Sequence, residues 1–244
     1  MNKYEIAYLF CESCSFIQTE DPYWLKESYE SAINDSDTGI MNRNIYLSKI
    51  TASLISFFFN KHGVFLDYAG GYGVFTRLMR DMGFDFYWSD PYCQNLLALG
   101  FEDEPTITKY DLLTSFETFE HLTDPLTEIQ QMFEKTETVL FSTETFIKSP
   151  PKLKEWWYYG LDHGQHISIY SVQSLAKIAN KINCSYYTNG KNIHLFSKQR
   201  LNPFYFKLAC KLANKGIYKL GLKGLKNRAF DDMLLIRKNK IENI

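Results

Sequence analysis

The sequence lacks the features of membrane and secreted proteins. None of its 244 residues fall in a run approaching 18 consecutive apolar side chains, which excludes a membrane-spanning helix. Its first residues, M-N-K-Y-E-I-A-Y-L-F-C-E, contain neither the apolar core nor the small-residue cleavage site of a secretory signal. The 5 cysteines are odd in number and scattered, so they do not form a regular disulfide framework. We therefore expect a cytoplasmic protein with reduced thiols.

The sequence also lacks an excess of charge of one sign, because its formal net charge is −1. Such a chain has no bulk attraction for nucleic acid, so we expect no nucleic-acid partner. The charge is uneven, since the residues from Arg200 onward contain 11 Lys and Arg against 3 Asp and Glu. Lysines at 207, 211, 215, 219 and 223 predict a basic, helical, amphipathic insert over 202–227. This insert could contact an acidic substrate, an anionic membrane surface or a partner subunit.

What the sequence does contain is an alternation of buried strands and helices. Apolar runs predict strands at 64–67, 84–89, 138–143, 184–187, 192–197 and 230–238, and a weak strand near 105–108 is followed by D-L-L-T-S-F at 111–116. Helical signals predict helices at 22–33, 41–60, 74–82, 92–99 and 125–135, and one that begins after Ser171 as N-cap. This alternation predicts a Rossmann-like, doubly wound α/β sheet of seven mostly parallel strands, with helices on both faces.

The predicted domain organisation is an N-terminal α/β extension, 1–40, followed by a main domain, 41–244. The extension is a hairpin plus a helix, and its turn contains Cys11-Glu-Ser-Cys14. Paired C-x-x-C turns commonly bind zinc, but the chain has no second pair, so we expect free thiols and no metal. A long irregular segment, 144–170, carries W-W-Y-Y and is typical of a functional loop.

The residues that point most directly to chemistry are V-F-L-D-Y-A-G-G-Y-G at 64–73. A buried strand stops at Asp67, a glycine-rich turn follows, and a helix begins near Val74, as in a nucleotide-binding βα unit. A dinucleotide site requires a further glycine at position 76, where this chain has Thr76. The next strand ends on Asp90, whose carboxylate can accept both hydroxyls of a ribose. These residues favour S-adenosylmethionine over NAD(P).

Four stretches in this order resemble the motifs of class I S-adenosylmethionine-dependent methyltransferases of the sugar and small-molecule type. They are L-D-Y-A-G-G-Y-G, Asp90, D-L-L-T-S-F-E-T-F-E-H-L-T-D-P and H-I-S-I-Y-S-V-Q-S-L. The resemblance covers roughly residues 41–200, and Ala69 stands where the family usually has a glycine. It implies a set of cofactor-binding residues: Asp67, Ala69, Gly70, Gly71, Gly73, Asp90, Pro91, Phe116 and Glu117. If the helix at 41–60 folds back, Arg43 could pair with the carboxylate of the cofactor.

Methyl transfer to a hydroxyl requires an in-line geometry and a base that removes the hydroxyl proton. The candidate bases are three histidines, His163, His121 and His166, and His163 in D-H-G-Q-H is the one we favour. We expect an enzyme that methylates a small acceptor, a hydroxyl of a sugar or nucleotide-sugar. A non-catalytic subunit that binds S-adenosylmethionine for a partner is an alternative, as is an NAD(P)-dependent oxidoreductase.

Overall fold

The computed structural model describes residues 3–29, 37–147 and 149–242. The chain divides into two compact units. The first unit consists of Met1–Asp37 and Ser115–Pro203, and the second unit of Thr38–Thr114 and Phe204–Ile244. The predicted division between an extension of 1–40 and a domain of 41–244 stays a prediction. No helix in the described ranges has the length and hydropathy needed to cross a membrane.

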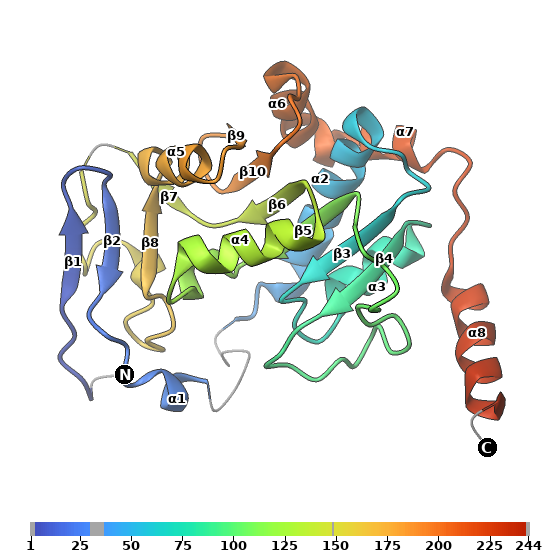
Figure 1. Cartoon of the computed structure of the whole chain (residues 1–244), viewed down its shortest axis with the longest axis horizontal. Coiled ribbons are helices and arrows are strands. Elements are labelled where there is room, and N and C mark those ends of the chain that lie inside the picture. Colours follow the sequence, from blue (N-terminus) through green and yellow to red (C-terminus); the bar gives the residue numbers. More distant parts are fainter. Residues whose placement is uncertain (1–2, 30–36, 148, 243–244) are drawn as a thin grey trace. The chain divides into compact units, whose positions relative to one another are not determined.

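The second unit contains parallel strands in the order β4-β3-β5 (Figure 1). Their bounds are Val64–Tyr68 for β3, Asp85–Ser89 for β4 and Leu112–Phe116 for β5, whose last two residues belong to the first unit. The register places Leu66 between Tyr87 and Leu113. Phe65 and Leu66 are both 0% exposed, so β3 is buried on both faces, as its continuous apolar run predicts.

Helices make up the rest of the second unit. They are α2 (Ile40–Phe58), α3 (Val74–Asp81), α6 (Pro203–Leu212), the 3-10 turn η3 (Ala213–Lys215), α7 (Tyr218–Leu222) and α8 (Ala229–Glu242). Helix α2 packs against α3 and α7, and its residues Ile50, Leu54 and Ile55 are fully buried. The predictions of helices at 41–60 and 74–82 are therefore confirmed.

The predicted helix at 92–99 is wrong, because side chains bind the backbone groups that a helix would use. Asp90 Oδ1 accepts the N–H groups of Tyr92 and Cys93 at 2.8 and 2.9 Å. Asn95 Oδ1 accepts the N–H of Ala98 at 2.9 Å. These local hydrogen bonds hold the segment in successive turns. The strand predicted at 105–108 is also absent from the described residues.

The predicted strand at 230–238 lies within the helix α8, so that prediction is wrong too. The basic insert over 202–227 is helical but not one helix. It is divided at Gly216, whose φ of 89° is left-handed and ends the turn η3 before α7 begins. A contact between this insert and a membrane or partner stays a prediction.

The first unit contains strands in the order β6-β10-β9. Strand β10 (Ile193–Ser197) is antiparallel to β6 (Thr138–Ser142) and to β9 (Ser185–Thr188). Among the described residues, the strand order that corresponds to the predicted sheet contains six strands, one fewer than the predicted seven. The helices α4 (Pro125–Lys135) and α5 (Val172–Lys181) form where predicted. The N-cap at Ser171 is confirmed, since its hydroxyl accepts the N–H of Ser174 at 3.0 Å.

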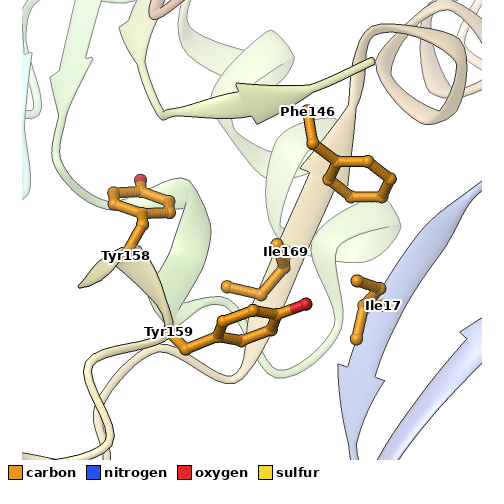
Figure 2. Packing of buried hydrophobic residues seen from close by; sticks show 5 residues of the cluster. All are labelled: Ile17, Phe146, Tyr158, Tyr159 and Ile169. Atoms are coloured by element: carbon orange, nitrogen blue, oxygen red, sulfur yellow. The ribbon is translucent and has the colours of Figure 1, made fainter. Parts of the chain in front are cut away.

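A second sheet in the first unit has the order β1-β2-β8-β7. Strands β1 (Tyr8–Cys11) and β2 (Phe16–Thr19) form the predicted hairpin, while β7 (Thr145–Phe146) and β8 (Ser168–Ser171) arise within the segment predicted to be irregular. Figure 2 shows the core of this region, which consists of Ile17, Phe146, Tyr158, Tyr159 and Ile169. Of the helix predicted at 22–33, only α1 (Leu25–Ser28) is helical in the described part, and residues 30–33 lie outside it.

Candidate functional site

The glycine turn after β3 is shaped for close approach of a ligand to the backbone. Gly73 has a φ of 83°, and a Cβ there would lie 2.9 Å from Asn95 Oδ1. Gly71 also has a left-handed φ, 53°, but nothing lies within 4 Å of the position its Cβ would take. The turn is therefore packed at Gly73 and open at Gly71. Ala69, with a φ of 56°, adopts the left-handed conformation without the freedom of glycine.

Asp67, at the end of β3, stabilises the turn from inside the second unit. Its side chain is 2% exposed, and its two oxygens accept hydrogen bonds from Thr76 Oγ1 at 2.9 Å and Thr114 Oγ1 at 3.0 Å. Burial raises the pKa of Asp67 to about 7, and the two threonine hydroxyls offset this only in part. Thr76, which stands where a dinucleotide motif has glycine, thus connects α3 to β3. Its hydroxyl is a positioning group that the sequence motif did not reveal.

Replacing Asp67 with asparagine is expected to change how stability depends on pH. The folded protein holds a proton on Asp67 that the unfolded chain loses from about pH 4 upward. The contribution of this bound proton to the free energy of unfolding is therefore complete at low pH and is lost as pH rises through about 7. The Asp67→Asn variant cannot ionise there. Between pH 4 and pH 7 the wild type should therefore lose more than about 1 kcal/mol of free energy of unfolding relative to the variant, measured by urea unfolding. Parallel pH curves for the two proteins would contradict this, and Asp231→Asn, at an exposed site, is the control.

Asp90, at the end of β4, connects the two loops that border the turn. Its Oδ2 accepts the N–H of Gly71 at 2.9 Å, while its Oδ1 accepts the N–H groups of Tyr92 and Cys93. The carboxylate is half-buried and, because each oxygen has two lone pairs, it retains acceptor capacity. The indole of Trp88 donates to the carbonyl of Gly71 at 2.9 Å and fixes the other side of the turn.

Three other predicted cofactor residues, Gly70, Pro91 and Arg43, also belong to the second unit. Gly70 is packed, since a Cβ there would lie 2.7 Å from Asp67 Oδ2. Pro91 is exposed beside Asp90, and Arg43 lies half-buried in the first turn of α2. For these residues, as for Asp67 and Asp90, contact with a cofactor stays a prediction.

Phe116 is the last residue of β5 and Glu117 follows it, both in the first unit. Glu117 has a left-handed φ of 53°, unusual for a residue with a side chain. Its N–H donates to Ser142 Oγ at 2.9 Å, and that hydroxyl donates to Glu117 Oε1 at 2.5 Å. This strained, doubly anchored residue at a strand end is typical of a ligand-contacting position. Its predicted contact with the cofactor, and that of half-buried Phe116, stay predictions.

The three predicted histidines lie together in the first unit. The rings of His121 and His166 are 5.0 Å apart, and those of His163 and His166 are 4.9 Å apart. Burial lowers the pKa of His121 to about 3 and that of His166 to about 4, so both are neutral at physiological pH. His121 and His166 are 45 positions apart in the sequence, and no sequence pattern predicts their contact.

The hydrogen bonds of the three rings differ. His166 Nδ1 lies 2.5 Å from the carbonyl of Tyr158, and a carbonyl only accepts, so this Nδ1 carries the proton and Nε2 presents a lone pair. His121 Nδ1 lies 3.1 Å from the carbonyl of Gln165 and 2.9 Å from the hydroxyl of Tyr29, and it has the same tautomer when it donates to that carbonyl and the hydroxyl accepts. His163 Nδ1 instead accepts the N–H of Gln165 at 3.2 Å, which leaves the proton on its Nε2. This tautomer is unfavourable for a base acting at Nε2, and the assignment of a general base to any of the three stays a prediction.

Glu120, beside His121, is a candidate site residue that was not predicted from the sequence. Its side chain is 0% exposed, and neither carboxyl oxygen makes a well-formed hydrogen bond in the described structure, although the hydroxyls of Tyr158 and Thr143 lie near enough to favour its charged form. Burial raises the pKa of Glu120 to about 8, with a further increase from Glu117. The nearby hydroxyls of Tyr158 and Thr143 bond to each other at 2.9 Å. The Glu120-His121 dipeptide was the sequence feature that could have pointed to this residue, but the burial of Glu120 is not visible in the sequence.

A protein-family model described as a methyltransferase domain matches residues 43–189. A search of curated proteins finds no match. Among solved structures, the plantazolicin methyltransferase BpumL in complex with SAH is 14% identical to this chain, with a TM-score of 0.50. The match covers 84% of this chain and 86% of that one. This likeness concerns the fold and agrees with the Rossmann-like α/β class expected from the sequence.

Two further solved structures are similar at lower TM-scores. A SAM-dependent methyltransferase from Thermotoga maritima is 10% identical, with a TM-score of 0.46, covering 72% of this chain and 97% of that one. The magnesium protoporphyrin IX methyltransferase of Synechocystis PCC 6803, with bound SAH, is 13% identical, with a TM-score of 0.43, covering 73% of this chain and 96% of that one.

Proposed function

Because the chain belongs to the family of methyltransferase domains, we propose that it transfers a methyl group from S-adenosylmethionine to a hydroxyl of a sugar or nucleotide-sugar. The family match confirms the predicted enzyme class and its cofactor, S-adenosylmethionine. The acceptor is the part that we propose here.

The observation that supports the cofactor assignment in this chain is the hydrogen bond between Asp90 and Gly71. It places a carboxylate with spare acceptor capacity beside an open, left-handed glycine. An adenosyl ribose offers two hydroxyl donors to such a carboxylate. A glycine beside the carboxylate allows the rest of the cofactor to approach the backbone closely. Thr76 stands where the dinucleotide motif has its last glycine, which allows the helix to pack closely on the strand, so the same turn is less suited to NAD(P).

The support for a sugar-like acceptor comes from the aromatic cluster at 156–159 in the first unit. Tyr158 and Tyr159 are 1% and 2% exposed and belong to the core shown in Figure 2. Trp157, between Trp156 and Tyr158, is instead 76% exposed. An exposed indole offers an apolar face on which the C–H face of a sugar ring can stack. The cluster thus consists of structural residues and one exposed ring.

The test is a panel of acceptors incubated with purified protein and S-adenosylmethionine, with release of S-adenosylhomocysteine as the readout. Nucleotide-sugars and free sugars form one arm, while phenols, amines and carboxylic acids form the other. Turnover confined to the sugar arm would support the proposal. Turnover confined to the other arm would overturn it. Binding of the cofactor without turnover of any acceptor would instead favour a non-catalytic subunit.

Replacing Trp157 with alanine is expected to lower kcat/KM for the sugar acceptor about tenfold, since one stacking contact contributes roughly 1 kcal/mol or more. Affinity for S-adenosylhomocysteine, measured by calorimetry, should not change. Leu153→Ala, at another exposed apolar residue of the same segment, is the matched control. An unchanged kcat/KM in Trp157→Ala would remove the indole from the acceptor site.

A further inference from the structure

Glu120 is a buried acid whose two oxygens make no well-formed hydrogen bond in the described part of the chain, although a buried carboxyl normally has hydrogen bonds or a counter-charge. The neighbouring hydroxyls of Tyr158 and Thr143 favour its charged form but are bonded to each other at 2.9 Å. No Lys or Arg forms an ion pair with it in the described structure. This arrangement indicates a positively charged or hydrogen-bonding ligand from outside the chain.

Two neutral imidazoles lie next to this acid. One ligand atom from each of Glu120, His121 and His166 lies within 4.8 Å of those from the other two. His166 Nδ1 faces the carbonyl of Tyr158, and His121 Nδ1 faces the carbonyl of Gln165 and the hydroxyl of Tyr29. In the tautomer in which both Nδ1 atoms donate to these carbonyls, each Nε2 lone pair is available to an ion. Histidines that bind metals are held in this way, with one ring nitrogen on a carbonyl and the other on the ion.

We propose that Glu120, His121 and His166 bind a divalent transition-metal ion, with Zn²⁺ as the expected occupant. Two imidazoles and one carboxylate are a donor set that Zn²⁺ uses in sites with a fourth position open to an oxygen ligand. The ion would be bound by the Glu120 carboxylate oxygens, which make no well-formed hydrogen bond in the described structure. Zinc binds such nitrogen and oxygen ligands at roughly 2.0–2.2 Å.

No metal was expected from the sequence, because the C-x-x-C at Cys11 and Cys14 has no second cysteine pair. The proposed ligands come from η1 (Phe119–His121) and from the segment before β8, which no zinc-binding spacing connects. The proposed site is made by residues of the first unit alone. It does not rest on the proposed function, since the cofactor turn belongs to the second unit.

The test uses the full-length protein, stripped with a chelator and titrated with Co²⁺ as a visible probe for Zn²⁺. We expect one Co²⁺ per chain, with absorption bands of a low-coordinate nitrogen and oxygen site and no thiolate charge-transfer band, and displacement by Zn²⁺. Glu120→Gln, His121→Gln and His166→Gln should each weaken binding about 100-fold or more. His62→Gln, at an exposed histidine, and a Cys11→Ser/Cys14→Ser double variant should bind as the wild type does.

Absence of Co²⁺ binding by the wild type would overturn the proposal. So would wild-type affinity in the three ligand variants, or loss of binding in the cysteine variant alone. Glu120→Gln keeps the size of the side chain and is neutral, like the protonated acid, so it tests the site even if a histidine variant fails to fold. Calorimetry with S-adenosylhomocysteine on Glu120→Gln distinguishes a failure here from a failure of the proposed function.

Discussion

Replacing Asp232 with alanine is expected to destabilise the protein by about 3–5 kcal/mol, because it leaves a buried guanidinium without its main partner. Arg80 is 1% exposed, and its Nε and Nη2 donate to the two oxygens of Asp232, each at 2.8 Å. Arg77 Nη2 donates to the same carboxylate at 2.8 Å. Burial tends to raise the pKa of Asp232, but the hydrogen bonds from Arg80 outweigh this and keep the pKa below its ordinary value.

This ion pair connects α8 to α3 and to β4 within the second unit. Arg80 also donates from Nη1 to Asp85 and to the carbonyl of Phe86, both at 2.8 Å, and its guanidinium lies 3.5 Å from the ring centroid of Phe101. These contacts hold the Arg80 guanidinium in its buried position when the Asp232 carboxylate is removed. The charge therefore stays buried with two N–H groups unsatisfied, which is the costly outcome.

The measurement is urea unfolding followed by circular dichroism, with Asp231→Ala as the matched control. Asp231 is the exposed neighbour in the same helical turn, so its loss should cost less than about 0.5 kcal/mol. An Asp232→Leu/Arg80→Met double variant should be more stable than Asp232→Leu alone, because it removes the unpaired charge. A loss below about 1 kcal/mol in Asp232→Ala would show that the pair contributes little.

Replacing Asp90 with alanine is expected to weaken the binding of S-adenosylhomocysteine about 100-fold or more. Two ribose hydroxyls bonded to one carboxylate contribute roughly 1.5–3 kcal/mol each. The same substitution removes the acceptor for the N–H of Gly71, so the turn also loses its order before the ligand arrives. Both effects act in one direction, and each is local to the second unit.

Isothermal calorimetry measures this effect, with Asp21→Ala, at an exposed aspartate, as the control. The control should bind as the wild type does. Circular dichroism at the titration temperature establishes that Asp90→Ala is folded. Unchanged affinity in folded Asp90→Ala would show that this carboxylate does not bind the ribose hydroxyls of the cofactor.

The sequence was sufficient to predict the parts of the fold that depend on local signals. The apolar run before Asp67 predicted β3, the glycines after it predicted the turn, and Ser171 predicted the start of α5. These signals are local because buried strands, tight turns and caps each impose their own residue types. The family resemblance rested on the same stretches, which is why the enzyme class followed from them.

The wrong predictions arose where distant residues decide the structure. The run M-L-L-I at 233–236 is as apolar as a strand, but Asp231 and Asp232 form the first turn of a helix there, and Arg80 binds one of them. A run this short does not distinguish a strand from a helix. Strand β8 was missed because its partner, β2, lies about 150 residues earlier, and pairing at that distance leaves no local pattern.

The site was predictable only in part, for the same reason. Gly71 and Asp90 could be selected from their places at the ends of two strands. The burial of Glu120 and the meeting of His121 with His166 depend on how β8 and η1 come together in the first unit. Burial and hydrogen-bond partners, rather than residue type, make Glu120 unusual, and neither property is visible in a single sequence.

The central claim is that the turn at 64–73 and Asp90 bind S-adenosylmethionine. The most direct measurement is a pair of calorimetric titrations of the purified wild-type chain, one with S-adenosylhomocysteine and one with NADPH. The account predicts one S-adenosylhomocysteine bound per chain and no binding of NADPH. Binding of NADPH with no binding of S-adenosylhomocysteine would contradict it.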